Sequence, residues 1–333
     1  MLANCSPDRG LLLVVVGPTG VGKTAFSMML ANDFGGEIIS ADSRLLYRGM
    51  NIGTDKPSAS DQALVPHHLV DVCQPDETIT LAQYKRLADA AIADVHRREN
   101  LPLLVGGTGQ YVKAIVEGWS IPEIAPKIGL REALQKLGGT ELYRWLAYLD
   151  PSSAKAIEVK NVRRVIRALE VTLISGQPMS QLRRKEPPPY DIKMIGLTCD
   201  REVLYKRIDE RVDRMMADGL VEEVEGLKAK GYSRALPAMS GLGYRQIMAY
   251  LEDESSLAAS VERIKFETHR FARQQHNWFR PDDDNIDWYD IQQLGWQARA
   301  IQDVKRFLSW PGNNALAHRD HEGTQRCKRR RLN

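Results

Sequence analysis

The chain has 333 residues, of which 43% are hydrophobic and 27% are charged, and its formal net charge at pH 7 is +3. This length is sufficient for a full α/β core and a second, smaller unit. A net charge this small excludes a globally basic surface, so any nucleic-acid contact has to come from local patches. The apolar runs are too short to span a bilayer, and the N-terminus lacks a signal-peptide pattern.

The chain contains four cysteines, none of them in a CxxC pair: Cys5, Cys73, Cys199 and Cys327. This spacing argues against a disulfide framework and against a four-ligand zinc site. Near the C-terminus, two histidines and Cys327 lack the second cysteine that a zinc finger requires. We therefore expect a reducing compartment, the cytoplasm.

A glycine-rich turn follows a buried strand near the N-terminus. Residues 11–16 are aliphatic without alternation, and the sequence becomes helical from residue 25. Residues 17–24, GPTGVGKT, fit the pattern G-x-x-x-x-G-K-[ST], and we call them the phosphate loop. Its glycines let backbone N–H groups approach phosphate oxygens, Lys23 supplies a positive charge, and the Thr24 hydroxyl can hold Mg²⁺. The loop predicts a bound di- or triphosphate, a property that kinases, ATPases and transferases share.

Polar residues follow two further predicted strands at the edge where open α/β sheets bind ligands. Asp42 comes after the strand at residues 37–40, and the sequence GGTG comes after the strand at residues 101–105. Asp42 can accept a proton or help to hold a phosphate-bound Mg²⁺; the alternative is a cap of the next helix. The GGTG stretch predicts a second backbone-lined binding surface, with a tight turn without a ligand as the alternative.

A short strand is expected over residues 66–72 and contains two histidines. His67 and His68 face opposite ways on a strand, which favours packing or strand-end roles over shared metal binding. The role of Asp71 remains open. It could be an outer carboxylate of a Mg²⁺ site or simply the end of the strand. An amphipathic helix is expected over residues 82–99.

Between residues 119 and 190 the strand-like runs disappear, and helical patterns follow over residues 130–137, 141–149 and 151–175. We expect a helical insertion that ends at a proline-rich turn. In its last helix, Arg163 and Arg167 are i,i+4 neighbours that can clamp a phosphate backbone. The alternative is a solvated helix face that pairs with acids such as Glu170.

The core resumes with a strand at residues 193–197 and a helix over residues 202–216. Arg207 and Arg211 lie four residues apart on one face of this helix. In phosphate-loop proteins a helical arginine commonly closes over the leaving phosphate and stabilises its charge. The alternative is an ordinary ion-pair face with the acids of the same helix.

Two later stretches have a composition that suits RNA. Residues 240–246, SGLGYRQ, open a helix with glycines, an aromatic residue and an arginine, which suits a nucleotide backbone or a stacked base. A basic helix over residues 262–280 adds amides and Trp278. These residues suit RNA better than DNA, which needs a dedicated major-groove reader.

The predicted fold class is α/β, with a parallel sheet of the P-loop NTPase type flanked by helices and interrupted by a helical insertion. We expect the chain to divide at residues 1–118, 119–190, 191–310 and 311–333. The first and third parts form the core, the second is the insertion, and the last is a disordered basic tail.

As a set, these motifs closely resemble the tRNA dimethylallyltransferases, also called tRNA isopentenyltransferases, over residues 12–288. The motifs are GPTGVGKT, ISADSRLLYRGMNIGTDKP, HHLVDV, LLVGGTGQY, RRVIRALEV, GLGYRQ and ARQQHNWFR, in this order. The chain departs from the family's usual pattern at Lys160-Asn161 and at Arg273-Gln274-Gln275, and it lacks the zinc finger of eukaryotic relatives.

The resemblance implies transfer of a dimethylallyl group from dimethylallyl diphosphate to N6 of the tRNA adenosine at position 37, beside the anticodon. It implies Mg²⁺ on Thr24, and a diphosphate in place of ATP. Asp42 would be the general base, and Arg211 would stabilise the departing diphosphate, with Thr19 and Lys23 completing the catalytic set. The diphosphate would bind to Gly17, Pro18, Thr19, Gly20, Val21, Gly22, Lys23, Thr24 and Arg207.

The resemblance also implies a partner, the anticodon stem-loop of tRNA, and a target adenine drawn out of its stack into a channel. The helical insertion would act as a lid over the anticodon stem. The implied RNA contacts are Asp42, Ser43, Arg44, Leu45, Thr108, Arg163, Arg164, Val165, Ile166, Arg167, Ser240, Gly241, Leu242, Gly243, Tyr244 and Arg245. We expect a monomer without a membrane partner.

Two other classes share the phosphate loop. A small-molecule or nucleotide kinase would use it with ATP and would not need the basic helices. An RNA-binding module without covalent chemistry would keep its function when Asp42 is changed.

Overall fold

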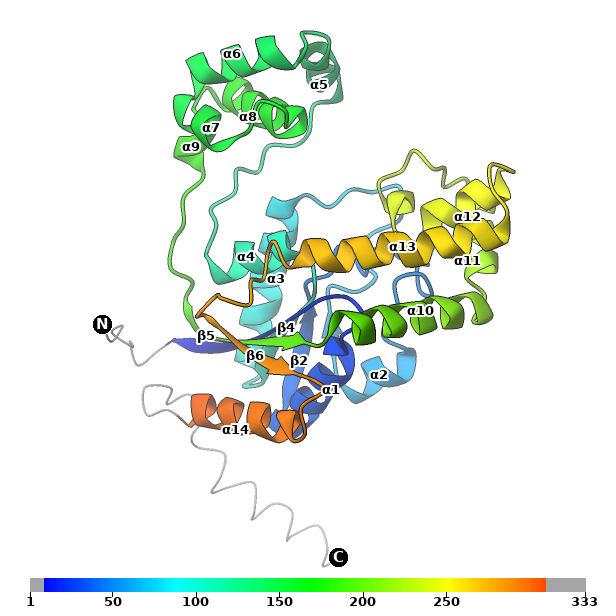
Figure 1. The fold of residues 1–333 in the computed structure, drawn as a ribbon. Helices are drawn as coiled ribbons and strands as arrows, with labels where there is room; N and C mark the ends of the chain where they lie inside the picture. Colours follow the sequence, from blue (N-terminus) through cyan, green and yellow to red (C-terminus); the bar gives the residue numbers. More distant parts are fainter. Residues whose placement is uncertain (1–8, 310–333) are drawn as a thin grey trace, which may run out of the picture. The chain divides into compact units, whose positions relative to one another are not determined.

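The computed structural model describes residues 9–309, so Cys5, Cys327 and the tail expected at residues 311–333 lie outside the described part. A six-stranded sheet forms the core, in the order β3-β2-β4-β1-β5-β6 (Figure 1). Every neighbouring pair of strands is parallel. The strands are β1 Gly10–Val16, β2 Gly36–Ser40, β3 His67–His68, β4 Leu101–Val105, β5 Tyr190–Thr198 and β6 Ile286–Asp290. The predicted α/β class with a parallel sheet is confirmed.

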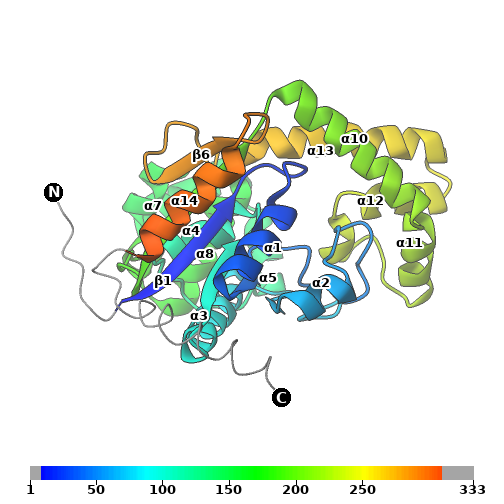
Figure 2. The same cartoon turned by 90° about the horizontal axis from the view of Figure 1, so that it is seen from below.

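Helices cover the sheet, because its central strand is apolar on both faces. Leu11, Leu13 and Val15 of β1 join one core cluster with side chains of helices α1 Lys23–Phe34, α10 Arg201–Ala217 and α14 Trp296–Leu308. Figure 2 shows α1 and α14 beside β1 on this face. The alternate residues of β1 are also fully buried and point to the opposite face.

The carboxyl ends of β1, β2 and β4 meet in one row of the sheet. Val15 pairs with Val105, and Val105 pairs with Ser40. The turns after these strands hold the phosphate loop, Asp42 and the GGTG sequence, so all three emerge at the same edge, as the sequence predicts. The turns pack tightly, since a Cβ at Gly106 would lie 2.3 Å from the carbonyl carbon of Ala41.

The remaining helices of the core follow the loops at this edge. They are α2 Ala59–Leu64, α3 Leu81–Arg97, α4 Gly109–Val116, α11 Leu220–Ala229, the 3₁₀ turn η1 Ala238–Ser240, α12 Tyr244–Leu251 and α13 Leu257–Gln275. Helix α13 begins earlier than expected because the Ser256 hydroxyl caps it, accepting a hydrogen bond from the backbone N–H of Ala259 at 3.2 Å. It ends at Gln275 and not at residue 280.

Two other predicted elements are shorter than the sequence suggests. The strand expected over residues 66–72 is limited to His67–His68, because Leu69 and Asp71 adopt left-handed backbone angles with φ of 61° and 55°. The helix expected over residues 151–175 is two helices, α7 Pro151–Ala156 and α8 Val162–Ser175.

The contacts divide the described residues into two compact units, of which the second comprises residues 80–86 and 113–188. The predicted insertion, residues 119–190, overlaps this helical unit. Its helices are α5 Ile128–Gln135, α6 Gly139–Leu149, α7, α8 and α9 Met179–Leu182, and they enclose their own apolar core. None of the helices between residues 9 and 309 combines the length and apolar character of a membrane span.

Candidate functional site

The phosphate loop is a left-handed turn that leads directly into helix α1. Gly22, with φ of 103°, is the last residue before the helix, so the first backbone N–H groups of α1 point toward the loop. The Lys23 ammonium donates hydrogen bonds to the carbonyl oxygens of Gly17 at 3.0 Å and Pro18 at 2.9 Å. The loop is thus built for an anion, with its lysine held against it.

The charge of Lys23 is set by its surroundings. Burial lowers the pKa of Lys23, the negative charge of Asp42 raises it and the positive charge of Arg211 lowers it, and together they give a pKa of about 8. The charges of Asp42 and Arg211 therefore both affect the pKa of Lys23. The structure brings together three predicted catalytic residues from three separate stretches of the chain.

Two arginines of α10 reach the phosphate loop. Arg211 donates from Nη1 to the Thr19 hydroxyl at 3.0 Å, and Arg207 donates from Nε to the carbonyl oxygen of Gly20 at 2.9 Å. Arg211 also lies 3.5 Å from a carboxylate oxygen of Asp55. Both arginines therefore extend toward the loop. They do not form the alternative, an ion-pair face with the acids of their own helix.

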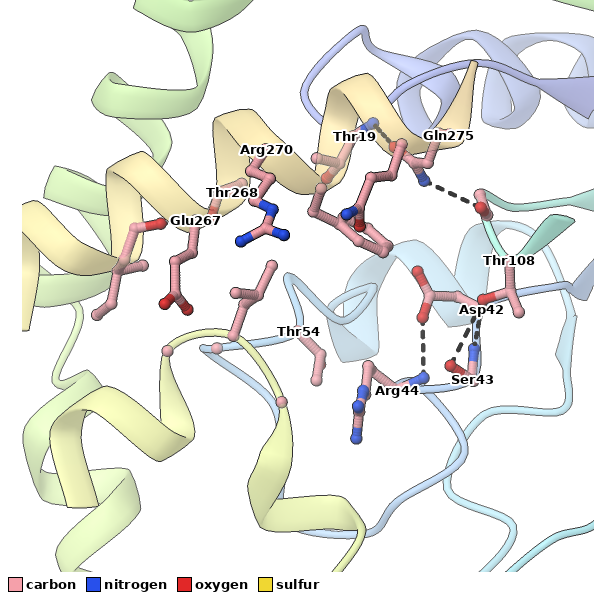
Figure 3. Close-up of a pocket in the computed structure, with 18 of the residues that line it drawn as sticks. Thr19, Asp42, Ser43, Arg44, Thr54, Thr108, Glu267, Thr268, Arg270 and Gln275 are labelled. Carbon is pink, nitrogen blue, oxygen red and sulfur yellow. Dashed lines mark hydrogen bonds between the residues drawn. The ribbon is translucent and has the colours of Figure 1, made fainter. Parts of the chain in front are cut away.

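The two carboxylate oxygens of Asp42 differ in their hydrogen bonds. Its Oδ1 accepts a hydrogen bond from the backbone N–H of Arg44 at 2.8 Å, which holds the turn after β2 (Figure 3). No group among residues 9–309 donates to Oδ2. The helix-cap alternative thus describes one oxygen only, and the other remains able to accept a proton.

Both glycine-rich loops, Asp42 and α13 border one pocket of about 660 Å³ (Figure 3). Twelve predicted site residues line it: Thr19, Asp42, Ser43, Arg44, Thr108, Arg211, Ser240, Gly241, Leu242, Gly243, Tyr244 and Arg245. The rest of the phosphate loop and Arg207 adjoin Thr19, while Leu45 is not among the lining residues. One wall is apolar, formed by Ile208, Val212, Met215, Ile264 and Phe271.

The two predicted RNA-contacting segments of this pocket are bonded to each other. Arg44 donates to the carbonyl oxygen of Pro237 at 2.9 Å and to the Ser240 hydroxyl at 3.3 Å. Thr108 accepts a hydrogen bond from the backbone N–H of Ser43 at 3.1 Å. These contacts connect the loops after β2 and β4 with the turn that precedes α12.

Several residues of the site carry no motif that would reveal them in the sequence. Glu223 accepts hydrogen bonds from the backbone N–H groups of Asn51 and Ile52, both at 2.8 Å, and from the Tyr244 hydroxyl at 2.6 Å. Glu267 forms an ion pair with Arg245 and accepts a hydrogen bond from Gln246 at 2.7 Å. Their roles depend on partners far away in the chain, so only the fold shows them.

Arg270 differs from the other arginines of the pocket. It lines the pocket from α13 and points into it (Figure 3). Arg44, Arg211 and Arg245 each have a hydrogen bond or an ion pair, whereas Arg270 has neither within residues 9–309. It is a cation without a protein counterpart in a pocket that begins at a phosphate loop.

In the helical unit, the predicted clamp of Arg163 and Arg167 is not what the structure shows. Arg167 forms an ion pair with Glu170 at 2.6 Å and donates to the carbonyl oxygen of Ile124 at 3.0 Å. Arg163 and Arg164 are exposed, and the side chains of Val165 and Ile166 are buried in the core of this unit. Burial therefore removes the side chains of Val165 and Ile166 from the set of possible RNA contacts.

The candidates set aside for metal binding have other partners. Asp71 pairs with Lys56 at 2.5 Å, and it is not a strand terminus because β3 ends at His68. His68 bonds to the buried Glu37 at 2.6 Å, and His67 bonds to the carbonyl oxygen of Val65 at 2.8 Å, so the packing role is confirmed. Within residues 9–309, no group of three or more histidine, cysteine and acidic residues forms a metal site.

A central strand that ends in a phosphate loop, covered by arginines of a later helix, defines a P-loop type α/β protein that handles a phosphorylated substrate. The chain belongs to the IPP transferase family, whose profile matches residues 45–282. The resemblance stated from the sequence motifs is confirmed.

Two relatives with high sequence identity have names that agree with this family. A tRNA dimethylallyltransferase of Roseiflexus castenholzii is 54% identical over 81% of this chain and 89% of the relative. A tRNA dimethylallyltransferase of Thermomicrobium roseum is 48% identical over 90% of this chain and 92% of the relative.

Solved structures of the same family share the fold. The tRNA isopentenylpyrophosphate transferase of Bacillus halodurans matches with a TM-score of 0.68 and 36% identity, over 94% of this chain and 100% of the other. A eukaryotic dimethylallyltransferase, solved acting on tRNA, matches with a TM-score of 0.78 and 26% identity, over 90% of this chain and 80% of the other.

Proposed function

We propose that this protein transfers the dimethylallyl group of dimethylallyl diphosphate to N6 of the adenosine at position 37 of tRNA, on the 3′ side of the anticodon. The observation that carries the proposal is the shared pocket of the phosphate loop and Asp42, in a chain whose relatives are named tRNA dimethylallyltransferases. A carboxylate beside a phosphate loop can hold Mg²⁺ or accept the proton of an attacking amine, and the names of the relatives favour the second role.

In the proposed reaction, N6 of the adenine attacks the first carbon of the allylic chain, and the bond from that carbon to the diphosphate oxygen breaks. The electron pair of this bond leaves with the diphosphate. Lys23, Arg211 and Arg207 carry the positive charge that stabilises the diphosphate as it departs. The remaining residues of the phosphate loop, Gly17, Pro18, Gly20, Val21 and Gly22, supply backbone surface to the same group.

Asp42 is the proposed base for this step. The attacking amine has to lose one proton, and the open Oδ2 of Asp42 lies in the pocket where a carboxylate can accept it. Its Oδ1 is held by the backbone N–H of Arg44, which fixes the orientation of the carboxylate. The product is N6-dimethylallyladenosine, and the proton remains on Asp42 until it passes to solvent.

Mg²⁺ is the proposed cofactor. This ion usually keeps several waters and binds through one or two protein oxygens together with substrate phosphates, not through an all-protein cage. The Thr24 hydroxyl, at the start of α1 and exposed, fits such a site. When bound, the ion would neutralise part of the charge on the diphosphate.

The proposed RNA contacts inside the core are Ser43, Arg44, Thr108 and the segment 240–245, which line the pocket. A base that reacts has to leave its stack, and the pocket of about 660 Å³ offers room for it. In the helical unit, the exposed Arg163 and Arg164 are the side chains of the predicted stretch that suit phosphate contacts of the anticodon stem. We further propose that the enzyme acts as a monomer.

The test is incorporation of labelled dimethylallyl groups into an anticodon stem-loop RNA. We expect transfer by the wild type, and a loss of at least about a hundredfold for Lys23→Ala and Asp42→Asn. Asp33→Asn is the matched control, because Asp33 is exposed on α1 and does not line the pocket. Hydrolysis of ATP without transfer would instead support a kinase or an ATPase.

A further inference from the structure

Gln275, the last residue of α13, uses both ends of its side-chain amide to join two loops. Its Oε1 accepts a hydrogen bond from the backbone N–H of Thr19 at 2.8 Å, and its Nε2 donates to the carbonyl oxygen of Gly107 at 3.0 Å (Figure 3). The side chain is buried, with 5% of the residue exposed. The amide therefore joins the phosphate loop to the second glycine-rich loop.

The second loop continues this connection to Asp42. Thr108, which follows Gly107, donates from its backbone N–H to the carbonyl oxygen of Ala41 at 3.1 Å. Its hydroxyl accepts a hydrogen bond from the backbone N–H of Ser43 at 3.1 Å. The residues on both sides of Asp42 are thus bonded to Thr108. A short path of hydrogen bonds leads from the phosphate loop through Gln275 to the proposed base.

The space around the amide shows that this connection is tightly fitted. A Cβ at Gly107 would lie 2.2 Å from Nε2 of Gln275, closer than carbon and nitrogen can approach. Gly107 has no left-handed backbone angle that would require glycine. Glycine at residue 107 therefore leaves the space that the amide of Gln275 occupies.

We propose that Gln275 is a positioning residue, which sets the separation between the diphosphate and the base. This inference rests on the proposed function. In a displacement reaction the leaving group and the attacking amine lie on opposite sides of one carbon, so the two loops have to be aligned. A displacement of about 1 Å is sufficient to lower a rate about a hundredfold. The amide of Gln275 bonds directly to both loops.

The experiment measures transfer and binding separately. We expect Gln275→Ala and Gln275→Met to lower kcat about 10- to 100-fold. Methionine keeps most of the volume of glutamine, so the fall in kcat of Gln275→Met measures the loss of the hydrogen bonds and not the effect of a cavity. The dissociation constants for pyrophosphate and for the stem-loop RNA should change less than about threefold, because each loop keeps its own binding groups. His276→Ala, on the same turn but outside the pocket lining, is the control.

A second variant tests the same contact from the other side. Gly107→Ala should displace the amide and give the same loss of kcat without changing Gln275 itself. The double variant Gly107→Ala with Gln275→Ala should lose no more than either single variant, since both remove one interaction.

Three results would overturn the inference. The first is an unchanged kcat for Gln275→Met, and the second is losses that add in the double variant. The third is a parallel fall of kcat, both affinities and the melting temperature, which would assign a purely structural role to the amide. A wild type that transfers nothing overturns the proposed function together with this inference, whereas an active wild type with an equally active variant overturns the inference alone.

Discussion

Nη1 of Arg211 donates a hydrogen bond to the hydroxyl of Thr19 at 3.0 Å, although 192 positions separate these residues in the chain. The guanidinium group is therefore in place at the phosphate loop before any substrate arrives. A charge that is already oriented stabilises a leaving group without having to reorganise during the reaction. Asp55, 3.5 Å from the same guanidinium group, supports this orientation from the other side.

Arg211→Ala should therefore lower kcat about 10²- to 10³-fold, the usual cost of removing one oriented donor from a developing negative charge. Single-turnover transfer to the stem-loop RNA measures this effect. Arg214→Ala is the matched control on the same helix, because Arg214 is exposed and does not line the pocket. Equal losses in both variants would contradict a specific role of Arg211.

The affinity for pyrophosphate should fall between about pH 7 and pH 9. Burial and the charges nearby lower the pKa of Lys23 to about 8, so its ammonium is mostly charged below this pH and mostly neutral above it. A neutral lysine no longer attracts the anion. Titration calorimetry at a series of pH values measures the change.

Pyrophosphate itself also titrates in this range, and Lys23→Arg supplies the correction because arginine stays protonated. The variant should show a flatter pH dependence than the wild type. The same slope for both proteins would refute the role of Lys23 in the pH response.

Arg270→Ala should weaken binding of the stem-loop RNA and reduce its salt dependence. Arg270 points into the pocket, and no group among residues 9–309 pairs with it. A phosphate oxygen is the natural counterpart for such a cation. Loss of one phosphate contact on a single strand reduces the slope of log K against log salt by about 0.7.

Arg273→Ala serves as the control for this prediction, since Arg273 bonds to the Tyr205 hydroxyl at 2.6 Å and does not line the pocket. A weaker affinity for pyrophosphate, with unchanged RNA binding, would place Arg270 on the diphosphate instead.

Glu170→Gln should destabilise the helical unit by about 3 kcal/mol. The carboxylate is fully buried and bonds to Arg131 at 2.7 Å and 2.9 Å, to Arg167 at 2.6 Å and to the backbone N–H of Lys127 at 2.8 Å. Removing its charge leaves two arginines without their counterion. Urea unfolding followed by circular dichroism measures the loss, and Glu158→Gln on the exposed surface of the unit should have almost no effect.

The same carboxylate should make the stability of the helical unit depend on pH in the acid range. Burial alone would raise the pKa of Glu170, but the hydrogen bonds from Arg131, Lys127 and Arg167 lower it to about 2. A carboxyl whose pKa is lowered in the folded state stabilises the fold above its ordinary pKa of about 4.5. This contribution is lost as the pH falls from about 4.5 to 2, and Glu170→Gln should remove this part of the acid dependence.

Local patterns predicted those parts of the molecule that depend on neighbouring residues. The phosphate loop and the placement of Asp42 at the same sheet edge follow from the strands before them, because parallel strands end on one side. The aliphatic β1 and the helical texture of residues 119–190 could also be recognised from composition and periodicity.

The parts that the sequence did not predict depend on distant partners or on backbone angles. The contacts of Glu223 with Asn51 and of Gln275 with Thr19 join residues more than 150 positions apart, so the sequence does not reveal them. The end of β3 depends on the positive φ of Leu69, a residue that rarely adopts it. The sequence left Arg167 open between a phosphate clamp and a pair with Glu170, and the structure shows the pair, because packing buries that carboxylate.

The order of the strands has a consequence for how this protein is made. Among residues 9–309, β1 is the first strand to be synthesised and lies in the middle of the sheet, and its partners β4 and β5 follow about 90 and 180 residues later. The sheet therefore closes late, and pairings this far apart in sequence form slowly. Residues 113–188 are complete before β5 exists, which leaves them time to collapse first. Gln275 follows β5, so both glycine-rich loops are synthesised long before the residue that joins them.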